Sequence, residues 1–160
     1  MTIKVPIKYL IGVGLLISAL TGCQKGSSTA PAPVISDTTK PTITIIKPTP
    51  GQSIDPGSTM PFQATFSDNE KLKSYGIEIS NVNKGGSILK NVPTSVPFSY
   101  TKPSTSFGLG TKQQDITLSD ITIPANSANK IVTPGKYYFK VTCVDGADNI
   151  AVTILEISIN

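Results

Sequence analysis

The sequence predicts an all-β protein, an immunoglobulin-like antiparallel β-sandwich of about seven strands spanning residues 40–160. Two observations predict it. Short segments rich in Ile, Val, Thr, Tyr and Phe recur between Pro, Gly, Asn and Asp, and none of them has a 3.6-residue apolar period. Seven short strands at this spacing are typical of two sheets packed face to face. A small open barrel is the competing architecture.

The first three expected strands are residues 42–47, 59–66 and 74–82. The first ends against Pro48-Thr49-Pro50-Gly51, where the backbone cannot continue a ladder. In the other two, apolar and polar residues alternate, so one face of each is expected to be buried. The expected inward residues are Met60, Phe62, Ala64, Phe66, Tyr75, Ile77 and Ile79. Leu72 is expected to close the end of the core.

Gly and Pro repeatedly interrupt residues 83–114, and only 96–101 is expected to form a strand there, at a sheet edge. In the next expected strand, 115–123, the apolar phase changes, which a bulge near Ser119-Asp120 would explain. Residues 136–144 are the expected central strand. Residues 149–159 are apolar in both phases, so one phase must meet loops or a neighbour.

The first 22 residues have the pattern of a secretion signal. Lys4 and Lys8 precede an apolar run of about a dozen residues, which is within the range of signal peptides and short of a membrane span. The run ends at Leu20-Thr21-Gly22-Cys23, which resembles the lipobox of bacterial lipoproteins. That resemblance implies cleavage before Cys23, recognition of Leu20, Thr21 and Gly22 by the signal peptidase, and a covalent lipid (diacylglycerol, palmitate) on Cys23. An uncut signal anchor is the alternative.

Residues 23–39 are rich in Gly, Ser, Pro and Thr and lack apolar periodicity, so we expect a lipidated flexible tether. Lipid attachment would place the domain outside the cytoplasm on a membrane surface. Gln24 follows the cysteine where an aspartate would imply retention in the inner membrane of some bacteria. The resemblance therefore favours the outer membrane.

The composition excludes several function classes. Removal of residues 1–22 leaves 12 Lys against 10 acidic residues, a net charge of +2, and the chain has no Arg, His or Trp. Nucleic-acid recognition is not expected without the guanidinium fork of Arg. The commonest acid–base and zinc-binding side chain is missing too. Cys143 is the only other cysteine; it lies in phase with core residues, so we expect a small core hydrophobe rather than a nucleophile.

Four motifs resemble a family of bacterial lipoprotein domains of unknown function with an immunoglobulin-like fold. They are residues 37–43 (DTTKPTI), 67–72 (SDNEKL), 123–139 with its PGKYYF ending, and 144–149 (VDGADN). The resemblance implies the fold and the location but no activity. Asp148 stands where Gly is common in this turn. Some relatives carry histidines on these strands, so a metal role of such residues does not transfer to this chain.

A calcium site is the sharpest chemical hypothesis. The sandwich topology would bring two acidic turns to one end, and calcium prefers six to eight hard oxygen ligands. The candidate ligands are Asp68, Asn69, Glu70, Asp145, Asp148 and Asn149. The alternative is that these residues only close turns, as Asp and Asn commonly do. Phe107 and Tyr138 are candidates for an exposed aromatic binding surface.

These observations predict a membrane-anchored, non-catalytic binding or adhesion module of the cell envelope, with a glycan or an envelope protein as partner. An accessory domain that positions an envelope protein, stabilised by calcium, is the alternative. An enzyme is the third and least favoured hypothesis, because no nucleophile elbow, phosphate loop or other catalytic arrangement is recognisable in the sequence.

Overall fold

The computed structural model describes residues 36–82 and 94–160. The expected signal peptide, Cys23 and most of the expected tether lie outside the described residues. The described residues belong to one compact unit. Nowhere in the described ranges is there a helix long and apolar enough to cross a membrane.

The described residues form ten strands. They are β1 (Thr42–Lys47), β2 (Ser53–Ile54), β3 (Thr59–Ser67), β4 (Leu72–Asn81), β5 (Thr94–Val96), β6 (Tyr100–Ser106), β7 (Gln113–Thr122), β8 (Lys130–Val132), β9 (Gly135–Asp145) and β10 (Ile150–Ile159).

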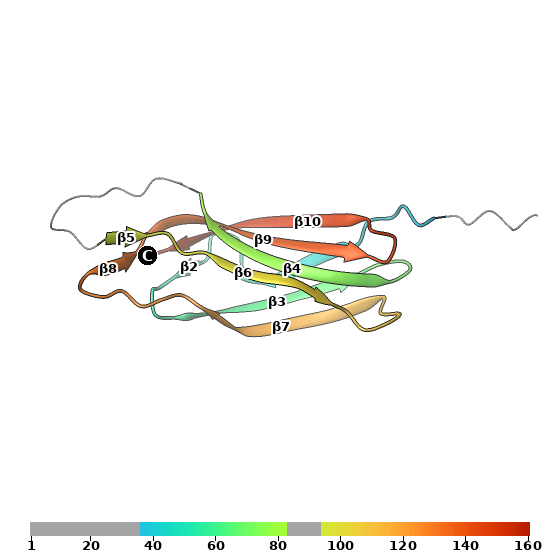
Figure 1. The fold of residues 1–160 in the computed structure, drawn as a ribbon, viewed down its shortest axis with the longest axis horizontal. Coiled ribbons are helices and arrows are strands. Elements are labelled where there is room, and N and C mark those ends of the chain that lie inside the picture. The colour runs from blue at the N-terminus through green and yellow to red at the C-terminus, as the bar shows by residue number, and fades with distance from the viewer. Residues whose placement is uncertain (1–35, 83–93) are drawn as a thin grey trace, which may run out of the picture. The chain divides into compact units, whose positions relative to one another are not determined.

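Two sheets pack face to face and form an immunoglobulin-like sandwich, which confirms the predicted fold class (Figure 1). One sheet has the order β1-β3-β7, and the other has the order β2-β10-β9-β4-β6. A third, two-stranded sheet is formed by β5 and β8. Two short pairs, β2 with β10 and β5 with β8, are parallel, whereas the sequence predicted antiparallel pairing throughout.

The core lies between the two large sheets, on the faces that alternation predicted. The inward apolar side chains of β3, β4 and β9 are all at most 4% exposed. Rings from opposite sheets meet there: Phe62 and Phe139 have centroids 5.6 Å apart, and Phe66 and Tyr75 have centroids 5.2 Å apart. Leu72 is 4% exposed at the end of the core, as expected.

The predicted single strand at 96–101 is wrong. Strand β5 ends at Val96 and pairs with β8, and β6 starts at Tyr100 and pairs with β4. Pro97 has no N–H for a ladder. Phe98 is 8% exposed and donates its backbone N–H to the Tyr137 hydroxyl at 3.3 Å. The chain therefore leaves one sheet and joins another where one continuous strand was expected.

The predicted bulge in residues 115–123 is confirmed. Along β3 and β7, Phe62 faces Leu118 but Met60 faces Ile121, so β7 contains one extra residue between them. That residue is Ser119 or Asp120. The bulge changes the phase of β7, so that Ile121 is fully buried.

The Tyr137 hydroxyl links β9 to the connection before β6. It donates to the Thr133 carbonyl at 2.6 Å and accepts the N–H of Phe98. Tyr137→Phe should lower the free energy of unfolding by about 1–3 kcal/mol, because the N–H of Phe98 and the carbonyl of Thr133 both lose their partner. Denaturant unfolding measures this. Tyr138→Phe, on the neighbouring residue whose side chain is 44% exposed, should change it by less than about 0.5 kcal/mol.

Cys143 is fully buried, as expected for a core residue. Burial, and then the nearby carboxylates of Asp68 and Asp145, raise the pKa of its thiol to about 12. The thiol is therefore protonated at neutral and mildly alkaline pH, and we expect a thiol reagent at pH 8 to label it only as fast as the domain opens. Peptide mass spectrometry of a labelling time course measures the rate. Labelling of the native protein as fast as a free cysteine would contradict this expectation.

Candidate metal site

Three carboxylates from distant parts of the sequence converge at one end of the sandwich. Asp37 precedes β1, Asp68 directly follows β3, and Asp145 is the last residue of β9. One oxygen of each lies within 4.8 Å of the corresponding oxygens of the other two. Asp145 is fully buried, and the other two are partly buried. We call these three residues the carboxylate cluster.

Backbone N–H groups hold each carboxylate in place. Asp37 Oδ1 accepts the N–H of Thr39 at 2.9 Å. Asp68 Oδ2 accepts the N–H groups of Glu70 and Lys71 at 2.9 and 2.8 Å. Asp145 Oδ1 accepts two N–H groups of the following turn, from Ala147 and Asn149, both at 2.8 Å. These short-range bonds are the turn-closing bonds typical of Asp.

Two other carboxylate oxygens of the cluster have no hydrogen-bond partner among the described residues. They are Asp37 Oδ2 and Asp68 Oδ1, and both are buried. No lysine of the described ranges forms an ion pair with any of the three carboxylates, since the lysines that do form pairs contact Asp148, Glu156 and Glu78. Three uncompensated negative charges at this separation repel one another, and buried unpaired oxygens are costly.

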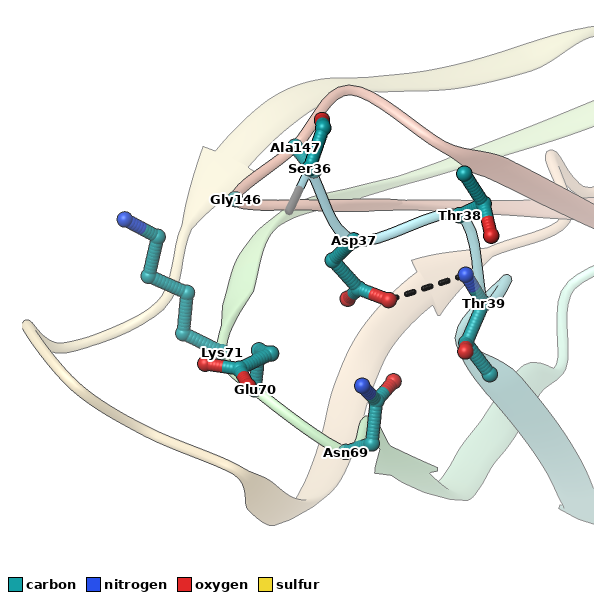
Figure 2. A pocket seen from close by; sticks show the side chains of 9 residues that line it. All are labelled: Ser36, Asp37, Thr38, Thr39, Asn69, Glu70, Lys71, Gly146 and Ala147. Carbon is teal, nitrogen blue, oxygen red and sulfur yellow. Dashed lines mark hydrogen bonds between the residues drawn. The ribbon is translucent and has the colours of Figure 1, made fainter. Parts of the chain in front are cut away.

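Asn149 connects the cluster to the segment that precedes β1. Its side-chain amide donates to Asp145 Oδ2 at 2.7 Å and to the backbone carbonyls of Asp37 and Thr39 at 3.1 and 3.2 Å. Residues 36–39, which the sequence places in the tether, therefore contact the domain. Figure 2 shows the Asp37–Thr39 bond with the Asn69 side chain beside it.

The hydrogen bonds around Asp37 favour its ionised form. The N–H of Thr39 and then the Asn69 side chain lower the pKa of the Asp37 carboxyl from its ordinary value. Asp37 is therefore charged at neutral pH. Beside it, a pocket of about 530 Å³ opens between residues 36–39, the 69–71 loop and the turn after β9 (Figure 2).

The donor set fits calcium. Oxygens bound to one calcium ion lie about 2.3–2.6 Å from it, so two of them are at most about 5 Å apart. The three carboxylates can therefore contact a single ion with little rearrangement. Their charge and hard oxygen atoms suit calcium, and backbone carbonyls or water would complete the six to eight ligands.

Residues 21–160 match a family described as a domain of unknown function, DUF4625. The chain belongs to this family. No curated protein matches the chain.

Solved structures resemble the DUF4625 domain only in their fold. The fibronectin(III)-like modules of Clostridium thermocellum CbhA share 14% identity at a TM-score of 0.37, over 74% of this chain and 46% of theirs. The superoxide reductase (neelaredoxin) from Ignicoccus hospitalis shares 11% sequence identity at a TM-score of 0.38, over 76% of this chain and 81% of its own. The soluble domain of PmoD from Methylocystis sp. shares 13% sequence identity at a TM-score of 0.33, over 75% of this chain and 90% of its own. Each comparison covers about three quarters of this chain.

The structure separates the six predicted ligands of the DUF4625 domain into two groups. Asp68, Asp145 and Asn149 come together, and Asn69 lies beside Asp37. Glu70 lines the pocket without belonging to the carboxylate cluster. Asp148 faces away: its side chain is 71% exposed and forms an ion pair with Lys73. Asp148 has φ of 68°, a left-handed conformation that glycine adopts most easily and that Asp tolerates.

The sequence did not single out Asp37 as a ligand. It lies in a Gly, Ser, Pro and Thr-rich segment that is typical of a linker. Two signals could have found it. Asp37 opens an Asp-Thr-Thr run that suits a turn immediately before a strand, and it is the first residue of the first family-like motif.

Phe107 does not belong to an exposed aromatic surface, contrary to the prediction. Its side chain is 9% exposed, and its ring packs on Phe66 and Tyr75 with centroids 5.4 and 5.3 Å apart. Phe107 is therefore a core residue and offers no surface to a ligand. Tyr138 does face solvent, at 44% exposure, on the outer face of β9.

Proposed function

We propose that this chain is a lipid-anchored, non-catalytic module of the bacterial cell envelope whose domain binds one calcium ion at the carboxylate cluster. The lipobox-like residues up to Cys23 support the anchor, which would place the domain outside the cytoplasm and favours the outer membrane. Extracytoplasmic compartments are where a calcium site of moderate affinity can be occupied. The single observation that carries the calcium part is the pair of buried carboxylate oxygens without partners.

The position of the cluster suggests what the ion would do. Asp37 lies 14 residues after Cys23, at the point where the chain from the expected anchor meets the domain. An ion shared by Asp37, Asp68 and Asp145 would join this segment to the ends of β3 and β9. Force on the tether would then act on several strands, whereas without the ion the hydrogen bonds of the Asn149 amide would carry it before it reaches β1, an edge strand. Such a link suits a module that must hold a partner away from a membrane.

The chemistry of the site supports a non-catalytic role. The thiol of Cys143 is buried and has a raised pKa, so it is a poor nucleophile. The carboxylates of the cluster accept backbone N–H groups in turns, an arrangement suited to holding an ion. We infer that the domain binds a glycan or an envelope protein, with Tyr138 on the exposed face of the larger sheet.

The alternative is an accessory domain that positions an envelope protein. It is favoured by one observation: Ile150, Val152 and Ile154 of β10 are each more than half exposed. A glycan array with the purified protein separates the two functions. Binding to a glycan class supports adhesion, whereas crosslinked envelopes that yield one co-purifying protein and no glycan signal support the accessory role.

The anchor is tested by mass spectrometry of the protein from bacterial membranes. We expect an N-terminal peptide that begins at Cys23 and carries acyl chains. Cys23→Ser should abolish acylation and cleavage. An unmodified N-terminus at Met1 in the wild-type protein, recovered from the cytoplasm, would contradict the proposed location.

A further inference from the structure

Along part of one edge of β10, the backbone groups have no hydrogen-bond partner within residues 36–82 and 94–160. The N–H groups of Ser158 and Asn160 and the carbonyl of Glu156 all bond to the segment containing β2, on the side away from β9. Because backbone groups alternate along a strand, Ile150, Val152 and Ile154 point their N–H and C=O groups to the same side. Within the described part of the chain, β2 pairs only with Ser158 and Ile159. Among the residues that the structure describes, no backbone hydrogen bond occupies this side of Ile150, Val152 or Ile154, so this part of the edge can accept another strand.

The other three edges of the two large sheets are protected against such pairing. Strand β1 shifts register between Ile45 and Lys47, and β7 carries the bulge and two aspartates. Strand β6 carries a register shift at the position that contains Pro103. Bulges, prolines and charges are the usual devices that prevent edge-to-edge association.

Strand β10 has none of these devices along its open edge. Its register with β9 is uninterrupted over ten residue pairs, from Ile150 to Ile159. Residues 150–155 contain no charged residue and no proline. On the outer face of this segment, Ile150, Val152 and Ile154 are 51%, 52% and 55% exposed. A regularly paired, uncharged, apolar edge of this kind is suited to pairing with another strand.

We propose that β10 pairs antiparallel with β10 of a second copy of this chain, about a two-fold axis at Val152. In this register Val152 faces its own copy, and Ile150 faces Ile154 of the second copy. The outer face reads Ile, Val, Ile in both directions, so the apolar stripe is self-complementary. The edge groups of these three residues then form hydrogen-bonded pairs across the axis.

Two features select this register and a second copy as the occupant. The carbonyl of Glu156 already accepts the N–H of Gly51 at 2.7 Å, so the free edge ends near residue 155. An axis two residues further on, at Ile154, would place Val152 opposite Glu156 of the second copy, which has an occupied carbonyl and a charged side chain. Centring on Val152 keeps every charged side chain out of the paired segment and matches the free edge from end to end.

The contact is small, because it joins one strand and three half-exposed side chains per copy. Stable dimers generally bury at least about 1,000 Å². We therefore expect a weak dimer in dilute solution and a well-populated one where copies are concentrated, as on a membrane surface.

Disulfide crosslinking of the full chain in bacterial membranes tests the pairing. Facing residues of a hydrogen-bonded antiparallel pair have Cα atoms about 5.5 Å apart, within the range for a disulfide. Under mild oxidation, Val152→Cys should form a dimer about tenfold faster than Thr101→Cys, an exposed position on the opposite edge strand β6. Both variants keep Cys23, so the comparison does not depend on the anchor. If the protein is recovered in a soluble fraction, the same comparison is made there.

The register has its own test. A mixture of Ile150→Cys and Ile154→Cys chains should crosslink, whereas each alone should not, because like positions would lie roughly 13 Å apart along the strands. Thermal melts confirm that each variant is folded. Equal rates for Val152→Cys and Thr101→Cys would overturn the proposal, and so would crosslinks of Val152→Cys to other proteins only.

Discussion

Asp145→Ala is expected to destabilise the domain by about 3–5 kcal/mol, because several hydrogen-bond donors lose their acceptor. The residue is fully buried and accepts three hydrogen bonds, from the N–H groups of Ala147 and Asn149 and from the Asn149 side chain. Its loss leaves these donors unpaired and releases the amide that holds the carbonyls of Asp37 and Thr39. Urea unfolding, followed by circular dichroism, measures the change.

Asp120→Ala is the matched control. Asp120 is an exposed aspartate in the bulged region of β7, so its removal should change the free energy of unfolding by less than about 0.5 kcal/mol. Equal effects of the two substitutions would show that the turn after β9 does not depend on the buried carboxylate.

Asp68→Asn is expected to have opposite effects with and without calcium. In a chelator, the substitution removes one of three repelling charges, while its side-chain oxygen can still accept the N–H groups of Glu70 and Lys71. Stability should then stay the same or rise slightly. In calcium, the wild-type protein should gain about 2.7 kcal/mol at 100 times the dissociation constant, and the variant should gain far less.

Thermal melts of the two proteins in chelator, calcium and magnesium measure this reversal. The wild-type midpoint should rise by roughly 10 °C in calcium. Magnesium at the same concentration controls for simple screening, because magnesium keeps more of its water and prefers a smaller, stricter octahedron. Asp115→Asn, an exposed aspartate of β7 outside the cluster, should respond to calcium as the wild type does. The idea fails if calcium raises the midpoints of wild type and Asp68→Asn equally.

The sequence predicted the parts of the fold that alternation controls. Along β3, every second residue from Met60 to Phe66 is apolar, and a period of two leaves only one way to bury them. The change of phase between Leu118 and Ile121 likewise required an extra residue, and β7 contains it. The segment around Phe98 could not be predicted in this way. There, a long-range bond from its N–H to the Tyr137 hydroxyl decides the path, and no local pattern encodes that contact.

The candidate site was predictable only where turn chemistry and topology coincide. Asp68 directly follows β3 and Asp145 ends β9, and both strands end at the same side of the sandwich, so their approach follows from the fold. Asp37 comes from a segment with the composition of a linker, and long-range contacts with Asn149 and Asn69 hold it at the cluster. Phe107 is the reverse case. Its Gly and Ser neighbours predicted an exposed loop, but its ring packs against Phe66 and Tyr75.

Isothermal titration of calcium into the purified, chelator-treated protein tests the central claim most directly. The carboxylate cluster predicts one ion per chain, and it predicts that Asp37→Asn and Asp145→Asn each abolish or strongly weaken binding because each removes one of the three charged ligands. Wild-type protein that takes up no calcium, or variants that bind it as the wild type does, would contradict the account.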